Sequence, residues 1–254
     1  MVGTVTQYIP KKLQNDAIIE AVCQLHFSSS NLPEIIIGRL SDVDSADEFN
    51  ITKLPASNLP YEMRSSDINL QFQPIMELTR KDKTHLIRFS EKVISYHLTG
   101  SGSYIGWEAF RAELLKTFRN LFDKVDVSEI FSISFRYINA IVENKHHLSD
   151  IHDLNFKAIV KEEALTCPVN LNFIVQNDEH HLTTTRIAHC DFVQGILPKG
   201  TNAIIDVEVS TPKFKFKVNN IDDVMQWVDV AHQFEKDAFF KLIPDEVIKK
   251  LEVK

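Results

Sequence analysis

Apolar and polar residues alternate over several short stretches of the chain, a pattern typical of half-buried β-strands. The clearest stretch is 17–27, where one face collects apolar side chains (Ile19, Ala21, Cys23, Leu25 and Phe27) and the other collects Glu20, Gln24 and His26. The same alternation predicts further strands over 68–72, 86–89, 94–98, 130–142, 168–176, 183–192, 203–209 and 213–218.

Two long segments change to a helical period. In 106–125 the apolar residues Trp107, Phe110, Leu114, Phe118 and Leu121 recur three and four positions apart, and a similar stripe runs from Asp222 to Leu242, before Pro244. We expect shorter helices over 32–41, with Asn31 as the N-cap and Pro33 in the first turn, and around 153–163. Segment 44–66 is polar and contains two prolines, so it predicts a loop.

The order of these elements predicts an α+β fold. Each half runs from a strand through a connection and an antiparallel meander to a long helix, so the pattern predicts two similar halves, 1–126 and 127–254, each an antiparallel sheet backed by a long C-terminal helix. An internal duplication would account for this similarity. The two halves form either two units or one joined domain.

Composition excludes several classes of protein. The chain of 254 residues carries 28 basic and 35 acidic side chains, a net charge of −7, which argues against a broad nucleic-acid or anionic-membrane surface. Its three cysteines lack C-x-x-C spacing, and neither a signal peptide nor a membrane-length apolar run is present, so we expect reduced thiols and a cytoplasmic location. The seven glycines form neither a Rossmann nor a P-loop motif, and we expect no cofactor.

Four segments, taken in order, resemble a sporadically distributed family of uncharacterised prokaryotic proteins. They are AIIEAVCQLHF (17–27), YIGWEAF (104–110), FRYINAI (135–141) and AHQFEKDAFFKLIPDE (231–246). At Ala17 the family more often has proline. The resemblance implies a protein of similar size and cytosolic location, encoded in defence or mobile-element neighbourhoods, and it supplies no catalytic residue.

Arg136 is the most informative polar residue, because a guanidinium within so apolar a strand needs a partner if it is buried. Asp206 and Glu208 share one face of a later strand, and Glu20 is a third candidate partner. Asn139 lies on the opposite face with Tyr137 and joins Arg136 only if a bulge shifts the alternation. The group Arg136, Asn139, Asp206 and Glu208 is either a polar ligand pocket or, more simply, contains a structural ion pair that fixes strand register.

Other candidate chemistry has simpler explanations. Lys213, Lys215 and Lys217 would line one strand face, which suits a nucleic-acid backbone but also protects a sheet edge. No zinc motif is present in three histidine-containing groups, which are His146, His147, His152 and Asp153; His180 and His181; and the run His189, Cys190 and Asp191. We therefore expect exposed turn histidines there and no metal site. No nucleophile motif is present, and no catalytic residue is assigned. Trp107 and Trp227 are interpreted as core anchors.

The sequence therefore predicts a cytosolic recognition or interaction module that binds a protein partner or a small ligand between its halves. A homo-oligomer is compatible with this hypothesis, a membrane is not expected, and nucleic acid is disfavoured. The alternative is an enzyme or small-molecule binder with a polar pocket over the sheet near Arg136.

Overall fold

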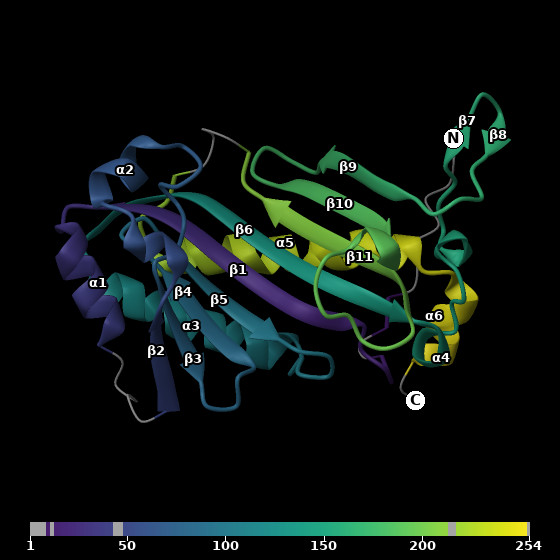
Figure 1. Cartoon of the computed structure of the whole chain (residues 1–254), viewed down its shortest axis with the longest axis horizontal. Coiled ribbons are helices and arrows are strands. Elements are labelled where there is room, and N and C mark those ends of the chain that lie inside the picture. The colour runs from purple at the N-terminus through teal and green to yellow at the C-terminus, as the bar shows by residue number, and fades with distance from the viewer. Residues whose placement is uncertain (1–8, 11–12, 43–47, 213–216, 253–254) are drawn as a thin grey trace.

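A computed structural model describes residues 9–10, 13–42, 48–212 and 217–252 (Figure 1). Nine strands form one antiparallel sheet in the order β2-β3-β4-β5-β1-β6-β11-β10-β9. Their bounds are β1 (Ile18–Ser29), β2 (Phe49–Lys53), β3 (Met76–Arg80), β4 (His85–Phe89), β5 (Val93–Thr99), β6 (Val127–Val142), β9 (Asn170–Gln176), β10 (Leu182–His189) and β11 (Thr201–Ser210). The strands of the two predicted halves therefore join into one sheet, through the pairing of β1 with β6.

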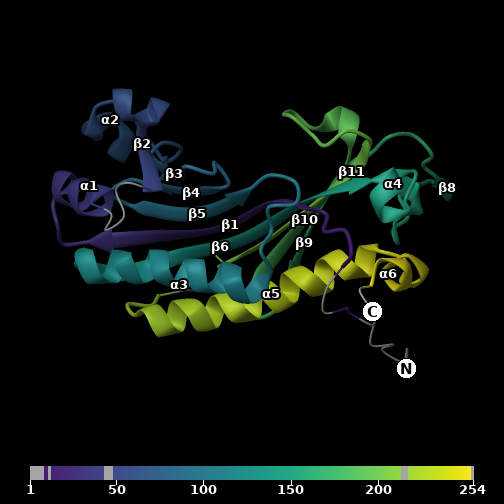
Figure 2. The same cartoon turned by 90° about the horizontal axis from the view of Figure 1, so that it is seen from below.

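Two long helices, α3 (Trp107–Lys124) and α5 (Ile221–Leu242), lie side by side along one face of this sheet (Figure 2). The apolar stripe of α3 explains its position, because Phe110, Leu114, Phe118 and Leu121 are all fully buried. Gly106 precedes the helix with a φ of 86°, a backbone conformation that glycine adopts without strain. The α+β class and the antiparallel sheet are thus confirmed.

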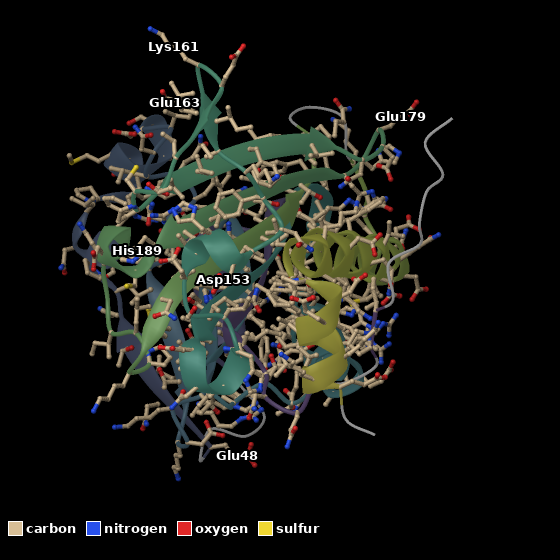
Figure 3. The ribbon with its side chains drawn as sticks, turned by 90° about the vertical axis from the view of Figure 1, so that its right-hand side faces the viewer. Glu48, Asp153, Lys161, Glu163, Glu179 and His189 are labelled. Carbon is tan, nitrogen blue, oxygen red and sulfur yellow. The ribbon has the colours of Figure 1, made fainter. Side chains whose placement is uncertain are left out.

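The shorter elements surround the sheet. They are α1 (Pro33–Ser41), α2 (Tyr61–Ser66), α4 (Glu143–His146), α6 (Asp245–Leu251) and the 3₁₀ turns Pro55–Asn58, Ile151–Asp153 and Cys190–Phe192. A separate hairpin, β7 (Ile159–Val160) with β8 (Glu163–Ala164), projects away from the sheet with Lys161 and Glu163 at its end (Figure 3). No helix among the described residues is both long and apolar enough to cross a membrane.

The sheet has one apolar face and one polar face. On β1, Ala21, Cys23, Leu25 and Phe27 are fully buried in the core beneath the helices. Neighbouring strands continue this face, since Cys23 pairs with apolar or aromatic residues on both sides. We call the opposite face, turned away from α3 and α5, the open face. Its polar side chains include Glu20, Gln24, His26, Glu77, Arg88, His97, Arg136, Asp206 and Glu208.

Several predicted elements are wrong. Residues 68–72 form turns instead of a strand, and Phe72 stacks on His26 of β1 with ring centroids 4.2 Å apart. Only Phe72 of this segment is shown packed on the open face, and Ile68 is 78% exposed, so the alternation of 68–72 did not indicate a strand. Within the predicted loop 44–66, the described part contains β2, a 3₁₀ turn and α2.

Two helix predictions also need correction. The helix expected around 153–163 is replaced by a 3₁₀ turn and the β7–β8 hairpin, whose turn residues Lys161 and Glu162 both have positive φ. The N-cap of α1 is Leu32, because the Asn31 side chain instead bonds Asp126 at the end of α3. α5 does end before Pro244, as predicted, but the chain then begins α6.

Candidate functional site

Arg136 of β6 is paired with Asp206 of the neighbouring strand β11. The guanidinium Nε and Nη2 donate to the two carboxylate oxygens at 2.7 and 2.6 Å. The hydrogen bond to Asp206 raises the pKa of Arg136. The Asp206 side chain is 11% exposed and that of Arg136 is 40% exposed. This ion pair, with two hydrogen bonds, links β6 to β11. It agrees with the interpretation of Arg136 as part of a structural ion pair.

The other two candidate partners of Arg136 lie on the same open face. Glu208 is directly opposite Arg136 in the β6–β11 register. Glu20 instead meets His97 of β5, with 3.1 Å between the carboxylate Oε1 and the ring Nδ1. This hydrogen bond lowers the pKa of Glu20. Arg136, Asp206 and Glu208 are therefore brought together, while Glu20 is engaged elsewhere.

Asn139 does not belong with them. The β6–β11 pairing runs without a shift from Ser134 to Ile141, so the alternation is kept and Asn139 points to the helix side of the sheet. There it is buried, and its Nδ2 donates to the backbone oxygen of Ile205. The grouping of Asn139 with Arg136 is corrected: the sheet itself separates them.

Asn139 lines a pocket of about 450 Å³ between the sheet, α5 and the start of α3. Apart from Pro10, Leu13 and Asp16, every residue that lines it belongs to one of the four motif segments quoted above. We call it the motif pocket. These segments are far apart in sequence, and pairing of β1 with β6 together with packing of α3 against α5 brings them to one place.

Glu235 is the most unusual group in the motif pocket. Its side chain lies on the buried face of α5, the residue is 2% exposed, and its carboxyl group makes no hydrogen bond or ion pair with any described residue. Burial raises its pKa well above the ordinary value. An isolated buried carboxyl group of this kind is costly unless it is neutral or acquires a partner.

His232 lies one turn before Glu235 on α5. Its ring stacks on Trp107 with centroids 3.9 Å apart, and its buried Nδ1 has no hydrogen-bond partner among the described residues. Burial lowers the pKa of His232 to about 3, so the ring is neutral at ordinary pH. Trp107 is therefore partly a pocket wall, whereas Trp227 is a buried core anchor that donates from Nε1 to the His180 oxygen.

Two tyrosines complete the polar part of the pocket. The hydroxyl groups of Tyr104 and Tyr137 are 2.8 Å apart and share a hydrogen bond. Burial raises the pKa of both, so both hydroxyls are neutral. The sequence analysis did not single out Tyr104, His232 or Glu235. Two of these residues could have been noticed, because His232 and Glu235 are polar residues within the apolar stripe of α5.

A second hollow, of about 300 Å³, lies beside the aromatic pair Phe72 and Phe131 on the open face. Its charged lining residues are Glu91 and Lys92, and Glu91 is already satisfied because it accepts two hydrogen bonds from Arg64 at 2.9 and 3.0 Å. Both side chains of this pair are almost fully buried. The hollow is therefore a less specific candidate than the motif pocket.

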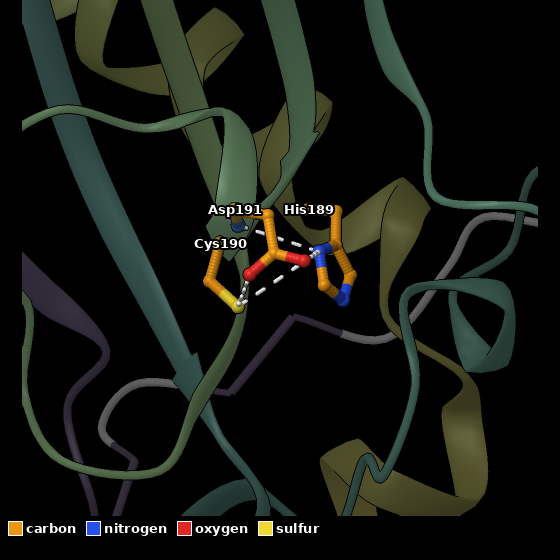
Figure 4. A group of neighbouring side chains, drawn as sticks. All are labelled: His189, Cys190 and Asp191. Atoms are coloured by element: carbon orange, nitrogen blue, oxygen red, sulfur yellow. Dashed lines mark hydrogen bonds and ion pairs between the residues drawn. The ribbon is translucent and has the colours of Figure 1, made fainter.

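His189, Cys190 and Asp191 place their potential ligand atoms within 4.8 Å of one another (Figure 4). They are consecutive residues, and His189 Nδ1 accepts from the Asp191 N–H at the start of a 3₁₀ turn. This is local turn geometry, with the Asp191 side chain 74% exposed. We assign no metal to it.

The expectation of exposed turn histidines is wrong for two residues. His146 is buried and accepts from the Val142 N–H at 2.8 Å, and His181 is buried against Asp178 at the same distance. The lysine face of 213–218 falls largely outside the described residues. Of its three lysines only Lys217 is described, and it lies 3.2 Å from Glu129 in an exposed ion pair.

No known family profile and no curated protein matches the chain. Among the solved structures that match, one described as "KH domains" has 7% sequence identity and a TM-score of 0.19. The match covers 91% of this chain, which spans 66% of the length of that structure. At this TM-score the likeness supports no conclusion about fold or function.

Proposed function

We propose that this protein is a cytosolic recognition module that binds a small molecule in the motif pocket. The observation that carries the proposal is the convergence of the four motif segments on one pocket that contains buried, unbonded polar groups. A pocket of about 450 Å³ has the size of typical small-molecule sites, which are mostly apolar with a few placed polar groups.

Energetics support a ligand. A buried polar group without a partner costs about 1–3 kcal/mol, and the His232 Nδ1 in the motif pocket is such a group. Beside it lies Glu235, a residue 2% exposed whose carboxyl has no hydrogen-bond partner among the described residues. A ligand that bonds to either group would offset this cost.

Native mass spectrometry of the protein purified from its own host, beside a denatured sample, tests the proposal. We expect a small molecule to be retained by the wild type and lost on denaturation. Trp107→Ala should release it, because this change removes a wall of the pocket. Phe131→Ala, on the open face, is the matched aromatic control and should retain it. A wild-type protein that carries no small molecule would contradict the proposal.

A protein partner on the open face is the second candidate function. Arg136 is held by Asp206 yet its side chain is 40% exposed, and Glu208 lies beside it, so this face offers charged contacts to a partner. A ligand or substrate bound near Arg136 would use the same groups. Arg136→Glu should then remove a co-purifying protein without removing a small molecule from the motif pocket, because the sheet separates the two sites.

We also propose that halves 1–126 and 127–254 arose by internal duplication. The strand order supports this, since each half places its last meander strand beside its first strand, β5 beside β1 and β11 beside β6, and then continues into a long helix. Superposition of the two halves would test it. Membership of the resembling prokaryotic family, with a role in defence, is a further proposal that phage challenge of hosts with and without the gene would test.

A further inference from the structure

Two groups in the motif pocket can accept hydrogen bonds from a ligand. Glu235 has no partner among the described residues. Asn139 uses its Nδ2 to reach Ile205, which fixes the amide and leaves its carbonyl oxygen without a hydrogen bond from any described residue. The hydroxyls of Tyr104 and Tyr137 already bond to each other. A ligand that donates hydrogen bonds would therefore satisfy both the Glu235 carboxylate and the Asn139 carbonyl oxygen.

The charges around the motif pocket favour a positive ligand. Its charged lining residues, among those described, are Asp16, Glu235 and Lys236. Asp16 opposes the ionisation of Glu235 and Lys236 favours it. An anionic ligand would approach two carboxyl groups and one ammonium group, whereas a cation would satisfy Glu235 directly. The remaining wall is apolar and aromatic, with Ile105, Phe239 and Phe240.

We propose that the ligand is an organic amine: a protonated primary amino group on an apolar body of about the size of an aromatic ring. The ammonium group donates to the Glu235 carboxylate and the Asn139 carbonyl oxygen, while the apolar body lies against Trp107 and Phe239. This inference rests on the proposed function and names its ligand class.

Binding of the amine is coupled to the release of one proton from Glu235. In the free protein, burial raises the pKa of Glu235 well above its ordinary value and so favours the neutral carboxyl. The ammonium group of the ligand stabilises the carboxylate, so Glu235 gives its proton to solvent and the amine stays protonated. The titratable groups of other residues that face or influence this carboxyl are Asp16 from the N-terminal segment, Tyr104 before α3, Tyr137 of β6, and His232 and Lys236 of α5.

Isothermal titration calorimetry with three matched probes tests the proposal: 2-phenylethylamine, the neutral 2-phenylethanol and the anionic 3-phenylpropanoate. We expect the amine to bind at least about tenfold more tightly than the alcohol, the effect of one charge-assisted hydrogen bond, and the acid to bind most weakly. Repeating the amine titration in buffers of different ionisation enthalpy should reveal proton release. The result overturns the proposal if the alcohol or the acid binds as tightly as the amine, or if the amine does not bind.

Variants separate this role from a structural one. Glu235→Gln should weaken the amine about tenfold, leave the alcohol unchanged and abolish proton release. Glu108→Gln, an exposed change at the start of α3, should behave as wild type. Lys236→Met should weaken the acid, because it removes the positive charge of the lining. Unchanged amine affinity or proton release in folded Glu235→Gln contradicts the inference.

The proposed function can survive failure of this inference. If native mass spectrometry finds a retained neutral or anionic small molecule, the motif pocket is a ligand site and the amine assignment is wrong. If the wild type retains no small molecule, the proposed function itself fails. The two experiments therefore give distinguishable outcomes.

Discussion

Glu235 should cause the protein to lose stability as the pH rises, and Glu235→Gln should remove that dependence. The folded state raises the pKa of this carboxyl group by burial, above the ordinary value of 4.5. As the pH rises, the group ionises first in the unfolded chain, which stabilises the unfolded state. The stabilising effect of the neutral carboxyl is therefore full below about pH 4.5 and is lost progressively up to the raised pKa.

The magnitude follows from one proton of difference between the two states. Such a difference changes the free energy of unfolding by about 1.4 kcal/mol per pH unit. Glutamine has nearly the shape of neutral glutamic acid and does not titrate, so wild type and variant should differ by less than about 0.5 kcal/mol at low pH. For each pH unit above this, the variant should gain at most about 1.4 kcal/mol, or about 3 to 6 °C in Tm.

Urea unfolding followed by tryptophan fluorescence, at steps between about pH 4.5 and 8, measures this difference. Glu108→Gln is the control, since it makes the same chemical change at an exposed position. Its free energy of unfolding should follow that of the wild type at every pH. If the difference between Glu235→Gln and wild type is constant across this range, the carboxyl is not held neutral by burial and the reasoning is refuted.

Three further predictions follow from other buried groups. Arg64→Met should reduce the free energy of unfolding by about 3–5 kcal/mol, because it leaves the buried Glu91 carboxylate unpaired. Arg136→Met should reduce it less, since the Arg136 side chain is 40% exposed. Equal reductions for the two variants in urea unfolding would contradict this. Burial lowers the pKa of His232 to about 3, so below pH 6.5 the ring is protonated in the unfolded chain before it is protonated in the folded protein. The free energy of unfolding of the wild type should therefore fall, relative to that of His232→Phe, by up to about 1.4 kcal/mol per pH unit as the pH decreases. Ellman's reagent should modify exposed Cys167 in the folded protein but reach Cys23, which is buried and has a raised pKa, only after unfolding.

Most of the sheet and both long helices were predictable because burial imposes a local period on the sequence. The alternation of 17–27 matches β1, and the apolar stripe of 106–125 matches α3 (Trp107–Lys124). A predicted strand was wrong where the alternation had another origin. Segment 68–72 alternates but forms turns, in which Ile68 is exposed and Phe72 packs on His26, a residue distant in sequence. α6 was missed because a seven-residue helix provides too few positions to establish a period.

Part of the candidate site was also predictable from the sequence, and part was not. The need of Arg136 for a carboxylate partner was evident from the sequence, and Asp206 is one of the three partners it suggested. The face of Asn139 followed from alternation, and the grouping with Arg136 failed because no bulge occurs between β6 and β11 at that point. The motifs with Tyr104, Asn139 and Glu235 were recognised separately, but nothing local indicated that they meet.

The sequence by itself therefore determined the strands and helices that repeat over many residues, the α+β class, and the demand of a strand arginine for an acidic partner. Only the tertiary structure decided that the strands form one sheet, that Asn139 and Arg136 lie on opposite faces of it, and that Glu235 faces a pocket. The periodicity of a segment indicates only which of its faces is buried. A pocket depends on distances between segments, and these distances are determined by strand pairing and helix packing.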